Sequence, residues 1–203
     1  MTSMTGMEMP GHGWPGTPVE FLGMWIAMMA AMMLPSIVPT LLRYRQSLGK
    51  TTLVGLGYFF VWAVVGTIAY ASSVALALSE MHLPAFANAV PSATGVVVLA
   101  AGALQFTEWK ARHLRCCRRG PWYGRSFTPD RRAAWQDGLR FGLHCVCSCA
   151  GPTAILLVAG MMDLRVMAVL TAGITLERLL PSGERVARVL GVVSVAAGCV
   201  LVA

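Results

Sequence analysis

The chain has 203 residues, of which 56% are hydrophobic and only 12% are charged. A soluble domain of ordinary composition has about 25% charged residues, so this chain has too little charge to cover the surface of a soluble globule. The composition argues against a soluble enzyme, a disordered chain and a secreted disulfide-rich domain. It favours an integral membrane protein.

Six segments are apolar for long enough to be candidate transmembrane helices, which need about 20 mostly apolar residues. In chain order they are residues 21–42, 53–78, 91–106, 139–160, 164–180 and 186–203. We therefore predict an all-α fold, a polytopic bundle of about six transmembrane helices that forms one domain over residues 21–203. Residues 1–20 are rich in Met, Gly and Pro and include His12, and we expect them to form a flexible tail.

The basic residues are distributed unevenly between the segments that connect these helices. Of the sixteen Lys and Arg, which give a net charge of +7, all but Arg165 fall on one side of the predicted bundle. The positive-inside rule places that side in the cytoplasm. Residues 108–138 then form a basic cytoplasmic loop, and both termini are extracytoplasmic. We expect a multi-pass protein of a bacterial plasma (inner) membrane with no nucleic-acid partner, because orientation alone accounts for the positive charge.

Three cysteines alternate in the predicted helix 139–160. Cys145, Cys147 and Cys149 follow His144 in the sequence HCVCSCAGP. On a regular helix Cys145 and Cys149 share a face, whereas Cys147 points about 160° away. Because Pro152 removes a backbone hydrogen bond, we predict an opened turn before it that brings the three thiols together. The alternative is that these small side chains only pack between helices.

The residue types in this run favour a soft metal. Thiolates are ligands for Cu(I), zinc and iron–sulfur clusters. The absence of CxxC pairs and the hydrophobic surroundings favour copper, as the low-charge ion Cu(I), over zinc. The five methionines of the first predicted helix can also bind Cu(I), although packing is the preferred interpretation for most of them. They are Met24, Met28, Met29, Met32 and Met33.

The basic segment contains a second group of candidate ligands. His113 and Cys117 are four residues apart, and Cys116 lies between them in the sequence RHLRCCRR. We expect the flanking arginines to lower the pKa of these thiols. The alternatives are a redox-responsive thiol pair and an ordinary basic segment that contacts anionic lipid. Near the end of the fifth predicted helix, Glu177 is expected to pair with a neighbouring arginine.

Four blocks of sequence together resemble a bacterial family of uncharacterised integral membrane proteins that is predicted to bind metal, a domain of unknown function. The blocks are WIAMMAAMMLPS, QFTEWKARHLRCC, GLRFGLHCVCSCAG and the run from GMMDLRVMAVL to LERLLPSGERVARVLG. Cys117, Cys145 and Cys149 fall where the family has cysteines, and His113 stands where it usually has one. The chain departs from the pattern at Cys147, where glycine is expected.

The sequence thus predicts a membrane protein that binds or handles a soft metal ion. The candidate ligands are Cys145, Cys149, Cys147, His144, His113 and Cys117. No catalytic triad, nucleotide-binding loop or catalytic carboxylate pair occurs in the sequence, so a non-enzymatic role is favoured. One alternative is a non-catalytic accessory or assembly subunit of a larger membrane metalloenzyme complex, since the small size and many glycines permit close contact with partner helices. A second alternative is a thiol redox membrane protein.

Overall fold

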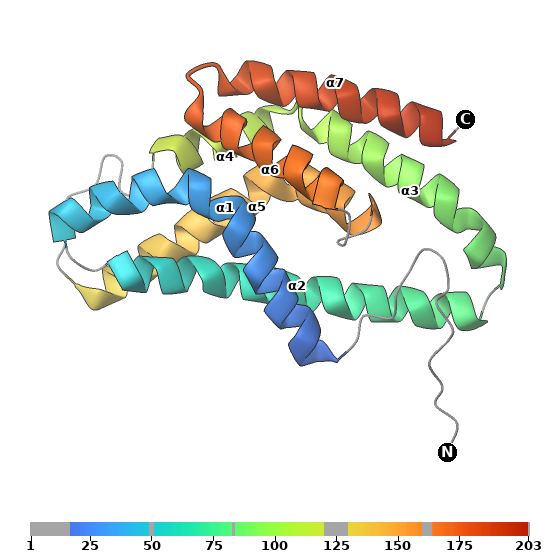
Figure 1. The fold of residues 1–203 in the computed structure, drawn as a ribbon, viewed down its shortest axis with the longest axis horizontal. Coiled ribbons are helices and arrows are strands. Elements are labelled where there is room, and N and C mark those ends of the chain that lie inside the picture. The colour runs from blue at the N-terminus through green and yellow to red at the C-terminus, as the bar shows by residue number, and fades with distance from the viewer. Residues whose placement is uncertain (1–16, 49–50, 83, 120–129, 160–163, 203) are drawn as a thin grey trace.

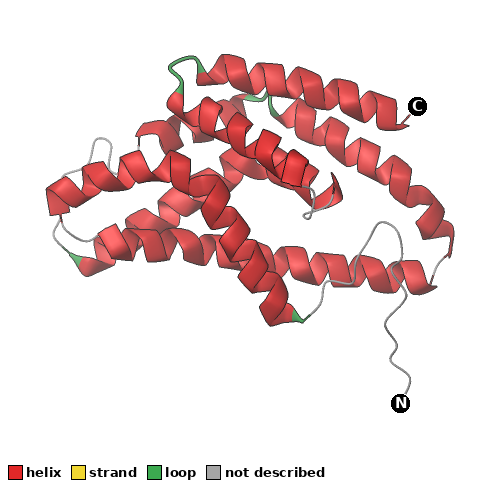
Figure 2. Cartoon of the chain, in the orientation of Figure 1, coloured by secondary structure: helices red, strands yellow, loops and turns green. Residues whose placement is uncertain are grey.

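The computed structural model describes residues 17–48, 51–82, 84–119, 130–159 and 164–202. Every regular element in these ranges is an α-helix (Figures 1 and 2). The helices are α1 (Pro18–Leu48), α2 (Thr51–His82), α3 (Pro84–Leu104), α4 (Glu108–Arg119), α5 (Arg131–Ala159), α6 (Leu164–Leu179) and α7 (Gly183–Val202). The predicted all-α class is therefore confirmed for the described part of the chain.

Each of the six predicted segments corresponds to one helix, and α4 is an additional one. The basic segment 108–138, which we expected to be a loop, contains α4 and the first turns of α5. Among the described residues, three stretches are long and apolar enough to cross a membrane, namely Thr51–Ser79, Arg131–Ala159 and Gly183–Val202. Pro18–Leu34 and Ser92–Leu104 are shorter apolar helices. The length and composition of the helices thus support three of the six predicted membrane spans, and the other three stay predictions.

Helix α1 begins with a capping box. The Thr17 N–H donates to the Glu20 carboxylate at 3.0 Å, and the Glu20 N–H donates to the Thr17 hydroxyl at 3.3 Å. This reciprocal pair satisfies backbone donors that a helix start leaves without an intrahelical partner. The bond from the Thr17 backbone is also the main cause that lowers the pKa of Glu20. The last residues assigned to the tail, 18–20, are therefore helical, while residues 1–16 lie outside the described part.

Helix α5 is the central element, because it contacts α2, α3, α4 and α6. Helices α3 and α7 lie side by side, and α1 crosses α2 and also reaches α6 (Figure 1). Helix α1 changes direction part-way along its length (Figure 1), as expected of a helix with the internal prolines 35 and 39. Helices α4 and α6 both contact α5 and also contact each other, so these three helices pack together.

Glycine allows α2 and α5 to approach closely. A Cβ at Gly138 would collide with the backbone of Val54, and one at Gly57 would lie 2.8 Å from the Trp135 carbonyl oxygen. Only residues without a side chain permit such a crossing. One consequence is that Tyr58, next to Gly57, packs against α5, where its ring centroid lies 5.4 Å from that of Phe141.

The buried core is rich in sulfur. Four of the five methionines of α1 are buried, and they belong to the same cluster of buried side chains as three cysteines. The members are Met28, Met29, Met32, Met33, Cys117, Cys145 and Cys149. Trp25 fixes α1 against α2 in this core, because its indole N–H donates to the Trp62 carbonyl oxygen at 3.0 Å. The outer faces of the helices expose large apolar side chains, such as Ile68, Val169 and Val200 at 61%, 64% and 78% exposure.

Candidate metal centre

Three cysteines lie around one buried serine. Cys145 and Cys149 are one turn apart on the buried face of α5, and Ser148 is buried between them. Its hydroxyl donates to the Cys145 carbonyl oxygen at 2.9 Å and lies 3.8 Å from the Cys149 Sγ. From α4, the Cys117 Sγ reaches to 3.6 Å from the Ser148 Oγ. We refer to Cys117, Cys145 and Cys149 as the thiol cluster.

The predicted opened turn at Pro152 is wrong. Helix α5 is continuous through this proline, so its side chains keep the regular angular spacing. Cys147 therefore points away from the other two thiols and is only half-buried. Both Gly151 and Pro152 are buried, and a Cβ at Gly151 would lie 2.9 Å from the Ala101 carbonyl oxygen of α3. Close support from a neighbouring helix is what allows proline inside such a helix. The third thiol comes from α4 instead.

Arg178 of α6 brings a positive charge to the thiol cluster. Its Nη2 lies 2.7 Å from the Cys145 Sγ and 3.3 Å from the Cys149 Sγ. The same nitrogen is 3.4 Å from the Ser148 Oγ, and the whole residue is only 8% exposed. Arginine stays protonated in proteins, so this charge is permanent. Our sequence reasoning missed Arg178, although a basic residue inside an apolar segment is a signal for a functional site.

Two further side chains lie beside Cys145. The Tyr58 hydroxyl of α2 lies 3.0 Å from its Sγ, and either atom can donate the hydrogen bond. The Met33 Sδ of α1 lies 3.9 Å from the same Sγ. Four helices besides α5 thus contribute to this site, which combines thiols, a thioether, a phenol, a hydroxyl and a guanidinium group.

A buried ion pair lies directly beside Arg178 in the chain. The Lys110 Nζ of α4 is 2.9 Å from the Glu177 Oε1 of α6, and both side chains are almost completely buried. The expectation that Glu177 pairs with an arginine is therefore wrong, because the fold brings a lysine from another helix to it. The pair joins α4 to α6, which are the helices that supply Cys117 and Arg178.

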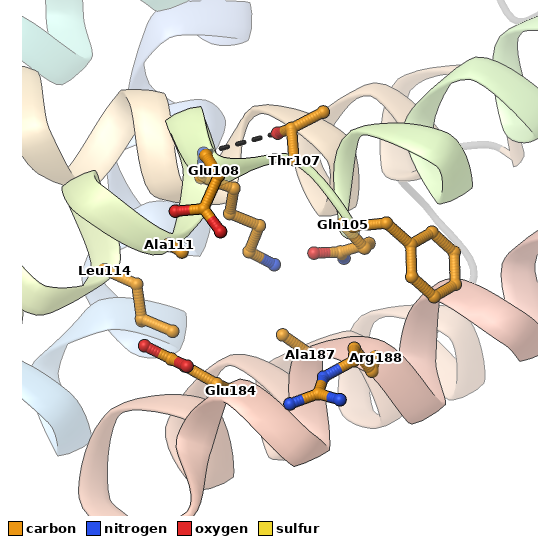
Figure 3. A pocket seen from close by; sticks show the side chains of 10 residues that line it. Gln105, Thr107, Glu108, Ala111, Leu114, Glu184, Ala187 and Arg188 are labelled. Carbon is orange, nitrogen blue, oxygen red and sulfur yellow. Dashed lines mark hydrogen bonds between the residues drawn. The ribbon is translucent and has the colours of Figure 1, made fainter.

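Lys110 also lines a cavity of about 260 Å³. Figure 3 shows Glu108, Glu184 and Arg188 around it, on α4 and α7. The buried Gln105 also lines it. The cavity is lined by charged side chains of both signs and by no thiol, so it is separate from the thiol cluster.

The two histidines predicted as ligands lie against each other. The ring centroids of His113 and His144 are 5.4 Å apart, and both residues are half-buried. The His113 Nδ1 is 2.7 Å from the Trp109 carbonyl oxygen. A hydrogen on Nδ1 accounts for this contact and leaves the Nε2 lone pair available, which is how metal-binding histidines are usually oriented. The geometry therefore divides five of the six predicted ligands into an imidazole pair and the thiol cluster, and Cys147 belongs to neither group.

The adjacent thiols Cys116 and Cys117 have opposite environments. Cys116 is exposed and Cys117 is buried, and all six cysteines of the chain are free. Burial raises the pKa of Cys117 to about 11, and the nearby charge of Arg178 only partly offsets this effect. The expectation of a lowered pKa is therefore wrong for Cys117, because the cost of charging a buried thiol outweighs the attraction of Arg178 and the hydrogen bond with Ser148.

Within the described ranges, no three side chains among His, Cys, Asp and Glu are close enough to form a metal site by themselves. The thiol cluster consists of a pair of thiols on α5 and a third thiol beyond the Ser148 hydroxyl, and the Met33 thioether lies beside Cys145. A two-coordinate ion needs only the pair, whereas a tetrahedral zinc site needs four ligands. The arrangement can therefore accommodate a thiophilic ion of low coordination number.

The PpoB2 family, described as a copper chaperone, matches residues 22–201. This range includes the thiol cluster, Arg178 and both histidines. No curated protein and no solved structure matches the chain. The family agrees with the soft-metal interpretation of the sequence at the level of copper handling, and because the match covers most of the chain, the protein belongs to the PpoB2 copper chaperone family.

Proposed function

We propose that this protein is an integral membrane copper chaperone. It carries one Cu(I) ion that is coordinated by the thiolates of both Cys145 and Cys149. The observation that carries the proposal is the burial of these two thiols on one helix face, beside a third thiol and a thioether. Soft sulfur ligands favour Cu(I). Binding replaces two S–H bonds by two Cu–S bonds and releases two protons, so the bound complex has one negative charge.

The same proposal places the protein in the bacterial plasma membrane. It is supported by the three long apolar stretches, by the large exposed apolar side chains and by the one-sided distribution of Lys and Arg. Soluble monomers rarely expose large contiguous apolar patches. We propose six spans with the basic segment in the cytoplasm, so that α1, α2, α3, α5, α6 and α7 cross the bilayer.

In this topology the thiol cluster lies in the cytoplasmic half of the membrane. Met33 contacts it, and the buried Met28, Met29 and Met32 continue from there toward the extracytoplasmic end of α1. Thioethers bind Cu(I) without a negative charge. A row of buried methionines therefore gives the ion a path between the outer side and the thiol cluster. The half-buried pair of His113 and His144 is a candidate exchange site next to the same cluster.

Copper binding by the purified full-length protein tests the assignment. In detergent, under anaerobic reducing conditions, we expect one tightly bound Cu(I) per chain in competition with a chromophoric Cu(I) chelator. The variants Cys145→Ser and Cys149→Ser should each lose this binding. The exposed Cys116 and Cys199 supply matched controls, because Cys116→Ser and Cys199→Ser remove a thiol that lies outside the cluster. Wild-type protein without stoichiometric Cu(I), or with binding that survives both cluster substitutions, would contradict the proposal.

A carrier needs a protein that receives its copper, and we propose that this partner is a membrane or membrane-associated metalloenzyme. Purification in mild detergent tests this part separately. A stoichiometric partner that dissociates when the thiol cluster is mutated supports transfer. A partner that remains bound irrespective of Cys145 and of copper supports an accessory or assembly subunit instead. Reversible disulfide formation in the absence of metal, counted by mass spectrometry, would favour the thiol redox alternative.

A further inference from the structure

Arg178 is the charged group that contacts the proposed copper ligands directly. One of its N–H groups lies within 3.3 Å of the sulfur atoms of both Cys145 and Cys149. Its neighbour Glu177 is engaged by Lys110 at 2.9 Å, and that pair has no net charge. The residue is buried, so solvent screens its charge only weakly. The charge of Arg178 therefore acts mainly on whatever occupies the thiol pair.

A count of charges shows which ion this arrangement favours. A monovalent ion between two thiolates forms a complex with one negative charge, and the guanidinium group makes the whole site neutral. A divalent ion between the same thiolates forms a neutral complex, and the guanidinium group then leaves a buried charge of +1. Net charge is costly to bury. The guanidinium group therefore makes the binding free energy more favourable for a monovalent ion than for a divalent ion.

We propose that Arg178 is a specificity-determining residue that selects a monovalent thiophilic cation, Cu(I) or Ag(I), over a divalent one such as Zn(II). The inference rests on the proposed ligand pair of Cys145 and Cys149. Arg178 acts through charge and through N–H groups that donate to the thiolates, because charge-assisted hydrogen bonds stabilise the charged form. It is not a ligand itself, since a guanidinium group has no acceptor.

Substitution of Arg178 separates its charge from its shape. Arg178→Lys keeps the positive charge, whereas Arg178→Gln and Arg178→Met remove it. Arg188 supplies the matched control, because Arg188→Gln removes an exposed positive charge that lines the separate cavity. For two charges about 4 Å apart at an effective dielectric constant of about 20, the interaction corresponds to roughly a thousandfold change in affinity. After relaxation we expect the ratio of Cu(I) to Zn(II) affinity to fall on the order of 100-fold in the neutral variants.

The readout is this ratio, measured for Cu(I) and Zn(II) separately by chelator competition. Arg178→Lys and Arg188→Gln should keep it within about tenfold of wild type, and Ag(I) should displace Cu(I) from the wild-type protein. Equal losses of both affinities in the neutral variants would show a merely structural role and overturn the inference, as would an unchanged ratio. If the neutral variants do not fold, Arg178→Lys alone tests the inference. A ratio of Cu(I) to Zn(II) affinity in Arg178→Lys that falls well below the wild-type ratio would overturn the inference, because this variant keeps the positive charge. By contrast, wild-type protein without thiol-dependent Cu(I) binding would refute the proposed function itself.

Discussion

The buried ion pair of Lys110 and Glu177 should be a main determinant of stability in the region of the thiol cluster. The variant Glu177→Gln leaves the Lys110 ammonium group buried without its carboxylate. At the observed separation of 2.9 Å, the Coulomb attraction is about 6 kcal/mol at an effective dielectric constant of about 20. Relaxation reduces this value, and the loss of one partner of a buried pair commonly costs about 3–5 kcal/mol. We expect a destabilisation in that range.

The assay is unfolding of the purified protein in detergent, by SDS titration and by thermal scan. For a chain of this length, about 3–5 kcal/mol corresponds to a decrease in Tm of roughly 6–20 °C. The control is Glu184→Gln, because Glu184 pairs with Arg115 at 3.7 Å and both side chains are about half exposed. An exposed pair contributes at most about 1 kcal/mol. Replacement of both buried partners, as Lys110→Met with Glu177→Leu, should recover most of the lost stability.

Two results would refute this reasoning. If Glu177→Gln and Glu184→Gln lowered the stability equally, the pair of Lys110 and Glu177 would not be buried as described. If the double variant were less stable than both of its single variants, Lys110→Met and Glu177→Leu, the penalty would come from lost packing and not from an unpaired buried charge. The double-mutant cycle distinguishes the two causes because the sites are in direct contact.

Three further predictions concern packing, topology and the site. Gly138→Ala should destabilise the protein by about 1–3 kcal/mol, because its Cβ would meet the backbone of α2, whereas Gly55→Ala, which has open space, should not. In membranes, a water-soluble maleimide should label the exposed Cys116, and the exposed Cys199 of α7 should react only with a lipid-soluble reagent. Tyr58→Phe should weaken Cu(I) binding about fivefold to tenfold, because it removes a hydrogen bond to the Cys145 sulfur.

Each of these predictions has a result that contradicts it. Equal stability of the two alanine variants would show that α2 and α5 do not cross closely at Gly138. Rapid labelling of Cys199 by the water-soluble maleimide would place the end of α7 in water and contradict the six-span proposal. An unchanged Cu(I) affinity in Tyr58→Phe, measured by chelator competition, would show that the phenol does not contact the ligand in the copper-bound protein.

The helices could be predicted from the sequence because their cause is local. Long apolar segments, interrupted by charged and turn-forming residues, specify where helices begin and end, and the structure has a helix at each predicted segment. The regular helical period also predicts that Cys145 and Cys149 share a face. The prediction of an opened turn at Pro152 was wrong. The effect of a proline depends on whether neighbouring helices support the turn, and here α3 supports it at Gly151.

The sequence by itself determined the helical class, the sulfur-rich composition of the core and the pairing of two thiols one turn apart. Only the tertiary structure decided which groups from other helices meet that pair: Cys117 from α4, Met33 from α1, Tyr58 from α2 and Arg178 from α6. Periodicity relates residues within one helix, whereas contacts between helices depend on crossings such as that at Gly138, where the absence of a side chain permits close approach. Contacts between helices also decide that Glu177 of α6 pairs with Lys110 of α4 and not with the expected arginine. The charge at the site is therefore a property of the packed bundle and not of any single segment.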